Sequence, residues 1–198
     1  MFKEIVVSIF ALLAMSLLIA PCEAAELVTN GGFETGNFTG WTVTNAASGS
    51  LIAVNTVDPH TGTYAASFGA ISSFDDTISQ TLATVAGQSY TVSFWLAHPY
   101  GPSTNDFSAY WGATQLMSLV GAGSFAYTQY SFTETASTSS TTLTFKGLEN
   151  PAYFYLDDAS VTGPTSVPES SSLFFLGVGV VGLVGVRRKL TIDQADAR

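Results

Sequence analysis

Three aromatic residues in this chain of 198 residues stand in polar surroundings, where their rings could contact a ligand. Trp95 lies on the Ser/Thr side of an alternating stretch, and Tyr100 and Tyr110 lie near Asn105 and Asp106. The C–H faces of sugars stack on exposed Trp and Tyr rings, while amide and carboxylate groups bond to sugar hydroxyls. These aromatic residues are therefore the candidate sugar-binding residues. Packing in the core is the competing explanation for each of them.

The sequence contains little that indicates catalysis. It has no Gly-x-Ser-x-Gly or His-Glu-x-x-His motif and no glycine-rich phosphate loop. Glycosidases hold two carboxylates facing each other across about 5–10 Å. The neighbours Asp75 and Asp76, like Asp157 and Asp158, should point to opposite faces of a strand. We therefore predict that the protein is not an enzyme, and only a carboxylate pair assembled from distant loops would make it one.

The distribution of charge excludes one class of ligand. The chain has 15 Asp and Glu against 6 Lys and Arg, and between Glu26 and Thr165 ten carboxylates face a single base, Lys146. Such a surface repels phosphate backbones, so nucleic-acid binding is excluded. The acidity favours divalent cations or neutral polymers as ligands, or serves solubility alone. The only cysteine, Cys22, lies in the N-terminal leader described below, so the domain has neither a disulfide nor a thiolate nucleophile.

Residues between Glu26 and Thr162 show the pattern of an all-β domain. Tyr90–Ala97 alternates between apolar and polar residues, and Gly112-Ala113-Thr114 forms a hairpin turn between two apolar stretches. About ten short strands at this spacing predict a two-sheet sandwich. The expected strands are Glu26–Thr29, Trp41–Thr44, Ser50–Val54, Tyr64–Phe68, Thr77–Ala83, Tyr90–Ala97, Phe107–Trp111, Gln115–Leu119, Ala126–Thr135, Thr141–Lys146 and Tyr153–Thr162.

Three segments of this domain resemble the jelly-roll carbohydrate-binding modules of the galactose-binding-like superfamily. Leu27–Glu34, followed by Gly40-Trp41, resembles their opening, Asp58–Tyr64 their second loop and strand, and Tyr155–Val161 their closing strand. The resemblance covers nearly all of the domain and implies a jelly-roll sandwich. Because the superfamily includes accessory modules of enzymes, adhesins and structural domains, the fold alone does not give the function.

The same resemblance implies a structural Ca²⁺ site. In the similar modules a Glu of the first loop and an Asp of the last strand bind the ion, and the matching residues here are Glu34 and Asp157. Calcium takes six to eight oxygen ligands, so backbone carbonyls near the glycines would complete the site. Asp158 should face the other side of the strand and is the weaker candidate. Alternatively, Glu34 is solvated and Asp157 only accepts hydrogen bonds from turn amides.

The N-terminus has the features of a secretory signal peptide. Lys3 precedes the apolar stretch Ile5–Ala20, Pro21 ends it, and small residues precede a cleavage point after Ala24. We expect residues 1–24 to be removed, leaving a jelly-roll domain of residues 25–163. An uncleaved anchor is one alternative, and lipidation of Cys22 is a minor one.

The C-terminus combines a linker, an apolar segment and a basic cluster. A Pro/Ser linker of residues 164–172 precedes the fourteen apolar residues Leu173–Val186, and Arg187, Arg188 and Lys189 follow. As a helix these fourteen residues span about 21 Å, less than the hydrocarbon core of about 30 Å. The glycines within the segment and the abrupt basic cluster nevertheless favour a short transmembrane helix over residues 173–189. Positive residues stay in the cytoplasm, so residues 190–198 form a cytoplasmic tail and the domain faces outward.

This C-terminus resembles the PEP-CTERM sorting signal of Gram-negative bacteria. The resemblance rests on Val167-Pro168-Glu169, the glycine-rich apolar helix and Arg187-Arg188. It implies recognition by an exosortase, a membrane protease, and delivery from the inner membrane to the cell surface or the exopolysaccharide matrix. Ser170 stands where the family has a second proline, and Thr191–Arg198 follow a basic cluster that usually ends the chain.

The sequence therefore predicts a non-catalytic, exported surface or matrix protein whose jelly-roll domain binds extracellular polysaccharide. The expected partners are this polysaccharide, an exosortase-type protease and, through the C-terminal helix, the membrane. A structural spacer domain without a ligand is the alternative, and a glycan-active enzyme is a third hypothesis.

Overall fold

The domain is an all-β sandwich, as predicted. The computed structural model describes residues 24–45, 50–69, 75–101 and 104–164. Within these residues the chain forms eleven strands and no helix. The strands are β1 (Ala24–Glu26), β2 (Thr42–Thr44), β3 (Ala53–Asn55), β4 (Ala65–Phe68), β5 (Asp76–Ala83), β6 (Ser89–His98), β7 (Thr104–Trp111), β8 (Thr114–Val120), β9 (Phe125–Thr135), β10 (Ser140–Asn150) and β11 (Phe154–Pro164).

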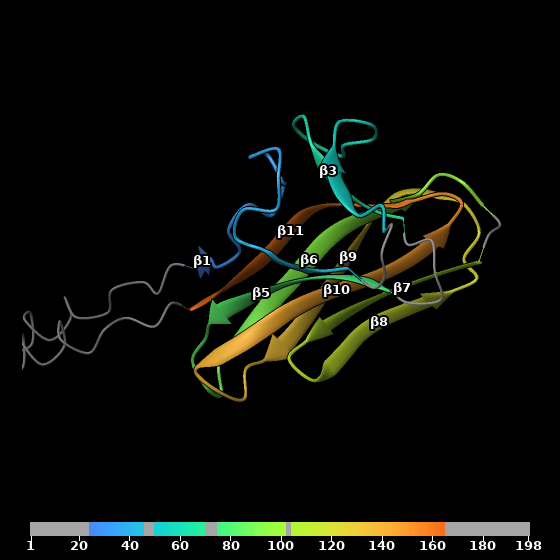
Figure 1. Cartoon of the computed structure of the whole chain (residues 1–198). Coiled ribbons are helices and arrows are strands. Elements are labelled where there is room, and N and C mark those ends of the chain that lie inside the picture. The colour runs from blue at the N-terminus through green and yellow to red at the C-terminus, as the bar shows by residue number, and fades with distance from the viewer. Residues whose placement is uncertain (1–23, 46–49, 70–74, 102–103, 165–198) are drawn as a thin grey trace, which may run out of the picture. The chain divides into compact units, whose positions relative to one another are not determined.

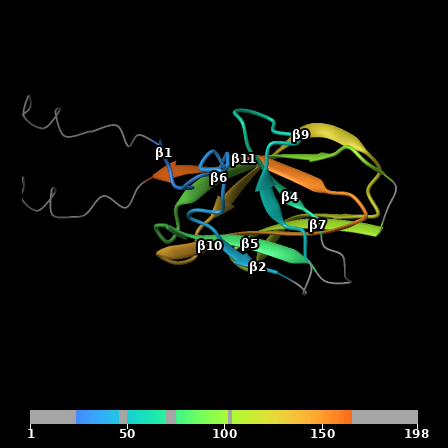
Figure 2. The same ribbon diagram turned by 45° about the horizontal axis from the view of Figure 1, so that its top comes forward.

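The strands form two antiparallel sheets packed face to face. The six-stranded sheet has the order β3-β4-β11-β6-β9, with β1 paired to the end of β11, and the five-stranded sheet has the order β2-β5-β10-β7-β8 (Figure 1). Figure 2 shows the two sheets as separate layers, with β4, β6, β9 and β11 above β2, β5, β7 and β10. This arrangement is consistent with the predicted jelly roll.

Alternating side chains fill the space between the sheets. Tyr90, Val92, Phe94 and Leu96 on β6 are buried on one face, as their spacing predicts. The Phe94 ring meets Phe145 of the opposite sheet edge-on, with centroids 4.9 Å apart. Burying one such side chain contributes roughly 1.5–3 kcal/mol, so this aromatic core accounts for much of the stability without disulfides. Trp41 and Trp111 are also buried, and Tyr90 packs against Trp111.

The two ends of the described domain pair with each other in the six-stranded sheet. Ala24 pairs with Pro164 and Glu26 with Thr162, so the first strand begins earlier than predicted. It also ends earlier, since its last residue is Glu26 rather than Thr29. The Glu26 carboxylate explains this, because it accepts hydrogen bonds from the Val28 and Val161 amides and the Ser160 hydroxyl.

The predicted signal peptide and the predicted C-terminal elements fall outside this description. Residues 1–23 and 165–198 are not described, so the linker, the sorting motif, the helix over 173–189 and the tail stay predictions. Among the residues that are described, no helix has the length and hydropathy needed to cross a membrane.

Candidate functional site

The first loop and the last strand of the domain hold the loop Asp58–Tyr64 between them. Glu34 accepts hydrogen bonds from the amides of Thr63 and Tyr64, at 2.9 and 3.0 Å from its Oε1. From β11, Asp157 Oδ2 accepts the amides of His60 and Thr61, at 2.8 and 3.1 Å. The two carboxylates that the sequence singled out therefore act on the same loop.

Local backbone geometry explains why the first loop can reach this position. Asn30 and Phe33 both have positive φ, and Phe33 turns its ring into the core against Trp41. At Gly31 any Cβ would lie 1.9 Å from the carbonyl oxygen of Ala159 in β11, so only glycine fits. A Cβ at Gly62 would similarly lie 2.4 Å from Glu34 Oε1. Gly31 of the opening motif and Gly62 of the loop Asp58–Tyr64 thus allow close contact between segments far apart in sequence.

Asp158 does not face away from this loop, contrary to the prediction. The register of β11 against β6 shifts between Asp157 and Ser160, and Asp158 has a φ of 47°. This bulge turns consecutive side chains toward one side of the strand. Asp158 Oδ1 consequently accepts the Thr61 hydroxyl at 2.7 Å, and its Oδ2 lies 2.7 Å from His60 Nδ1.

The carboxylate of Asp157 lies in a desolvated position. Asp157 is fully buried, and this burial raises its pKa to about 6, although the amides of Thr61, Asp158 and His60 act in the opposite direction. Its Oδ1 and the Glu34 side chain both approach Gly32, where a Cβ would lie 3.7 Å from the former and 3.8 Å from Glu34 Cγ. Carboxylate oxygens are hard ligands of the kind that Ca²⁺ prefers. These donors are of the chemical type that suits the ion, and the same oxygens also accept the backbone amides of neighbouring residues: His60, Thr61 and Asp158 for Asp157, and Thr63 and Tyr64 for Glu34.

The ligand set would need backbone oxygens as well. In the part of the chain that the structure describes, no group of three or more His, Cys, Asp or Glu side chains is arranged to hold one ion. A calcium ion here would be bound by Glu34, Asp157 and carbonyl groups of the adjoining loops. It would supply positive charge between the first loop and the last strand.

Trp95 is not an open sugar platform. It lies on the outer face of the six-stranded sheet, as predicted, but the imidazole of His60 stacks on its ring with centroids 3.9 Å apart and planes at 18°. Tyr127 flanks His60 at 5.0 Å, and its hydroxyl donates to the carbonyl of Asp58. The alternation of β6 gave the correct face, but the loop that covers this face comes from a distant part of the chain.

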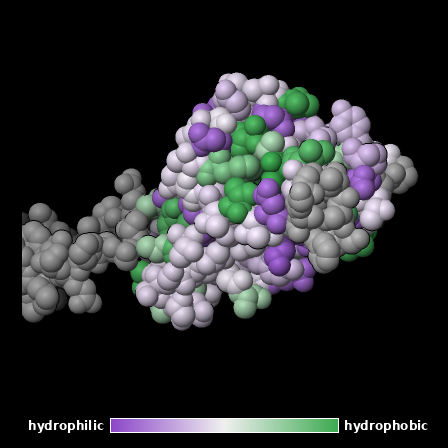
Figure 3. Space-filling model, in the orientation of Figure 1, coloured by the Kyte–Doolittle hydropathy of each residue, from purple (hydrophilic) through white to green (hydrophobic). Residues whose placement is uncertain are grey.

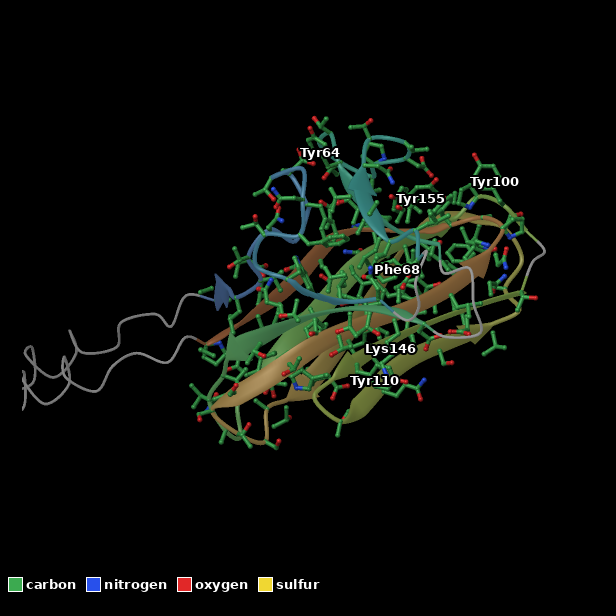
Figure 4. The ribbon with its side chains drawn as sticks, in the orientation of Figure 1. Tyr64, Phe68, Tyr100, Tyr110, Lys146 and Tyr155 are labelled. Atoms are coloured by element: carbon green, nitrogen blue, oxygen red, sulfur yellow. The ribbon has the colours of Figure 1, made fainter. Side chains whose placement is uncertain are left out.

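Tyr110 occupies the outer face of the five-stranded sheet. The ammonium of Lys146, from the neighbouring strand β10, lies over its ring at 5.2 Å from the centroid (Figure 4). The strand positions around them carry hydroxyl side chains: Thr144 pairs with both Tyr110 and Ser79, and Lys146 pairs with both Ser108 and Thr77. Much of the surface turned toward the viewer in Figure 3 is pale, as weakly polar residues are.

Tyr100 lies away from Tyr110. Its side chain is 57% exposed, and Figure 4 shows it well away from Tyr110, on the side where Tyr155 lies. A shallow depression of about 290 Å³ is lined by Pro99, the residue that precedes Tyr100, and by Ser124, Phe125 and Ala126. The structure thus places the three predicted aromatic residues in three different surroundings and does not bring them together.

Two acidic side chains, Asp75 and Asp106, are in contact in the structure, and the sequence did not predict this contact. Asp75 bonds to Asp106, which lies in β7 rather than in a loop. Burial, this bond and the charge of Asp75 raise the pKa of Asp106 to about 6. Since the folded state holds this proton more tightly than the unfolded chain, the pair costs stability as the pH rises from about 4 through 6. No local pattern could have indicated the pair, because its members come from separate segments.

Comparison with known proteins identifies the family. The sequence profile of the family described as "Carbohydrate binding domain" matches residues 25–151, more than half of the chain. The chain belongs to this family. The carbohydrate-binding domain continues in the structure to the end of β11, whose pairing with β1, β4 and β6 completes the six-stranded sheet. No curated protein matches the chain significantly.

Solved structures share the fold. A family 61 carbohydrate-binding module in complex with β-1,4-galactotriose has 23% identity and a TM-score of 0.56 over 69% of this chain and 97% of that one. A xylan-binding domain of family 22 has 14% identity and a TM-score of 0.53 over 73% and 99%. A structure of the family 22 and catalytic modules of a Clostridium thermocellum xylanase, in complex with xylohexaose, has 18% identity and a TM-score of 0.50. This match covers 72% of the present chain and 29% of the xylanase chain. At these identities the likeness shows the jelly-roll fold.

Membership of the family supports carbohydrate binding as the general function. Carbohydrate-binding domains are typically non-catalytic, although some of the structural neighbours, such as the xylanase, are parts of enzymes. The position of the sugar site and the identity of the ligand depend on the side chains of this particular domain.

Proposed function

We propose that this carbohydrate-binding domain binds a polysaccharide across the outer face of the five-stranded sheet, with Tyr110 as its aromatic platform. The observation that carries the proposal is the contrast between the two outer faces. The planar imidazole of His60 stacks on Trp95 with centroids 3.9 Å apart, whereas Tyr110 stands among hydroxyl side chains and carries over its ring the ammonium of Lys146, 5.2 Å from the centroid at the end of a flexible side chain.

The chemistry of this face suits a neutral polymer. Ser and Thr hydroxyls both donate and accept hydrogen bonds, and a lysine ammonium donates to sugar hydroxyls. The ten carboxylates against one lysine between Glu26 and Thr165 oppose polyanions. Side chains on the outer face of a β-sheet lie in rows along the strands, so the hydroxyl and ammonium groups of this face would follow an extended chain of sugar units. Tyr100 is the second candidate, for contact with a separate part of the polymer.

We further propose that the domain is exported and sorted as its terminal segments indicate. Removal of residues 1–24 would leave Ala25, which pairs with Gly163 in the folded sheet. Val167, Pro168 and Glu169, with Arg187 and Arg188, would present the chain to an exosortase-type protease. The domain would then reach the surface or exopolysaccharide matrix of a Gram-negative cell. A Ca²⁺ ion at Glu34 and Asp157 would stabilise it there.

Replacing Tyr110 by alanine should weaken polysaccharide binding about tenfold, the loss expected for roughly 1.4 kcal/mol of aromatic stacking. The measurement is the retardation of the protein in native gels cast with neutral polysaccharides, including the extracellular polymer of the producing organism. Tyr100→Ala serves as the comparison, because that ring is exposed at another place on the domain.

The outcomes distinguish the hypotheses. Undiminished binding by Tyr110→Ala, with loss in Tyr100→Ala, would move the site away from the five-stranded sheet. Folded wild-type protein that no polysaccharide retards would contradict the binding proposal and favour the structural spacer.

The sorting proposal predicts a processing defect. Replacing Pro168 and Glu169 by alanine should leave the full-length precursor in the inner membrane, because the protease would lose its recognition motif. Fractionation of the producing cells and immunoblotting would measure this, with Ser166→Ala as a control in the same segment. Normal release of the doubly substituted chain would exclude exosortase-type sorting through this motif.

A further inference from the structure

We propose that the outer edge of β9 pairs with β9 of a second copy of this chain. β9 is the last strand of the six-stranded sheet and is bonded to β6 on one side, and no strand among the described residues pairs with its other side. An edge strand presents a row of N–H and C=O groups that can pair with another strand. The question is whether this edge is protected against such pairing.

The edge lacks the usual protection. Proteins protect edge strands with lysine, proline, bulges or short length. From Thr128 to Thr135, β9 runs in unbroken register along β6, and its irregularity lies earlier, opposite the stretch from Leu96 to His98. These eight residues contain no lysine and no proline, and Glu134 is their only charged residue. Threonine, tyrosine and phenylalanine dominate the segment and favour extended pairing.

The inner face of this edge carries aromatic surface that is not fully covered. Tyr130 and Phe132 stack on Phe94 with centroids 5.5 and 6.2 Å apart, yet both stay partly exposed. β8, the outermost strand of the other sheet, has partly buried apolar residues too: Leu116, Met117 and Leu119. Apolar surface that remains open at the side of a sandwich is covered when another molecule adds to it.

The sequence of the edge is complementary to itself, which is why the partner is a second copy. In an antiparallel pairing with Ser131 on the two-fold axis, Tyr130 lies opposite Phe132 of the other copy, and Gln129 lies opposite Thr133. Aromatic cross-strand pairs of this kind stabilise antiparallel sheets. Glu134 falls opposite Thr128, so the register places no like charges in opposition.

Cross-linking tests this register directly. Ser131→Cys, in the full chain carrying Cys22→Ser, should form a disulfide-linked dimer on mild oxidation. In the proposed pairing the two Ser131 Cα atoms are about 4.5–5.5 Å apart, within the range that a disulfide spans. Thr133→Cys is the matched control, because its two copies would be roughly 13 Å apart along the strands.

Self-association supplies an independent readout. Sedimentation of the full chain in mild detergent across a dilution series should show a monomer–dimer equilibrium that Ser131→Lys weakens at least tenfold. Thr91→Lys adds the same charge on the same face, opposite Thr133 but on the inner strand β6, and should leave association unchanged. Added salt should tighten the dimer, because both copies are acidic.

Either of two results would overturn the proposal. A chain that stays monomeric throughout, with Ser131→Cys not cross-linked, would exclude pairing through β9. Efficient cross-linking through Thr133→Cys but not through Ser131→Cys would exclude the stated register. Neither result depends on whether the five-stranded sheet binds polysaccharide.

Discussion

Replacing Glu149 by alanine should lower the free energy of unfolding by about 3–5 kcal/mol, the cost of breaking a fully buried polar pair by removing one partner. Glu149 Oε2 lies 2.7 Å from Nε2 of His98, and both side chains are completely inaccessible to solvent. The Nδ1 of His98 lies 3.0 Å from the carbonyl of Gly123. Because that carbonyl can only accept, Nδ1 of His98 is the donor in this hydrogen bond.

The effect should be large because the surroundings are apolar. The ring of His98 stacks on that of Phe154, with centroids 4.5 Å apart, and its centroid lies 6.0 Å from that of Phe125. Without the carboxylate, Nε2 would stay buried among aromatic rings with no acceptor at the position that Glu149 had filled. The link to Gly123 would weaken as well, and this link holds the connection between β8 and β9.

Urea denaturation of the full chain measures the effect. Glu134→Ala, on a strand where that carboxylate is partly exposed, is the matched control and should change stability by no more than about 0.5 kcal/mol. The double variant His98→Leu/Glu149→Leu should recover much of the loss, because replacing both partners by apolar groups removes the unpaired polar atom. A loss below about 1 kcal/mol in Glu149→Ala would contradict the importance of this pair.

The sequence predicted the strands well because their signals are local. Each of the eleven expected strands overlaps a strand of the structure, the first through Glu26 alone, and the hairpin turn at Gly112 has the positive φ that glycine allows. Alternation along β6 correctly separated Phe94 from Trp95. Ends were less accurate, since β10 continues to Asn150 rather than ending at Lys146. β10 is longer than predicted because it stays paired with β7 as far as Asn150, which lies opposite Thr104. The length of a strand therefore depends on its partner as well as on its own sequence.

The candidate sites were harder to predict because they depend on contacts between distant segments. Nothing near Trp95 in the sequence indicates that His60 will cover it. His98 and Glu149 belong to different sheets, so the pair exists only after the sandwich closes. The prediction that Asp158 points to the other side of the strand was wrong, because a bulge interrupts the alternation there. The spacing of residues within one strand does not reveal a bulge. Glu34 and Asp157 were associated only through resemblance to related modules.

Calcium should raise the melting temperature of the wild-type chain by about 5–10 °C when present at a hundredfold excess over its dissociation constant. A ligand that binds the folded state alone then contributes about 2.7 kcal/mol, and for a domain of this size each kcal/mol shifts the midpoint by a few degrees. The ion would reinforce the contact that Glu34 and Asp157 make with the loop Asp58–Tyr64. That contact joins the first loop to the last strand.

Conservative variants separate a metal site from ordinary hydrogen bonding. In Glu34→Gln and Asp157→Asn an oxygen still accepts bonds from the loop amides, but the charge that holds Ca²⁺ is lost. Both variants should therefore fold and should lose the calcium-dependent rise in melting temperature. Asp158→Asn is the matched control: it is the adjacent residue, bonds to His60 and Thr61, and is not among the proposed ligands. Its response to calcium should be retained.

Thermal melting followed by circular dichroism, in calcium and in chelator, distinguishes the two explanations of the same geometry. If the carboxylates serve only the loop amides, wild-type protein will melt at the same temperature in both solutions, and Asp157→Asn will differ from it equally in each. If they bind the ion, the difference between wild type and Asp157→Asn will be larger in calcium than in chelator. A calcium response that Asp158→Asn abolishes and Glu34→Gln preserves would place the ion on the other side of the loop, against His60.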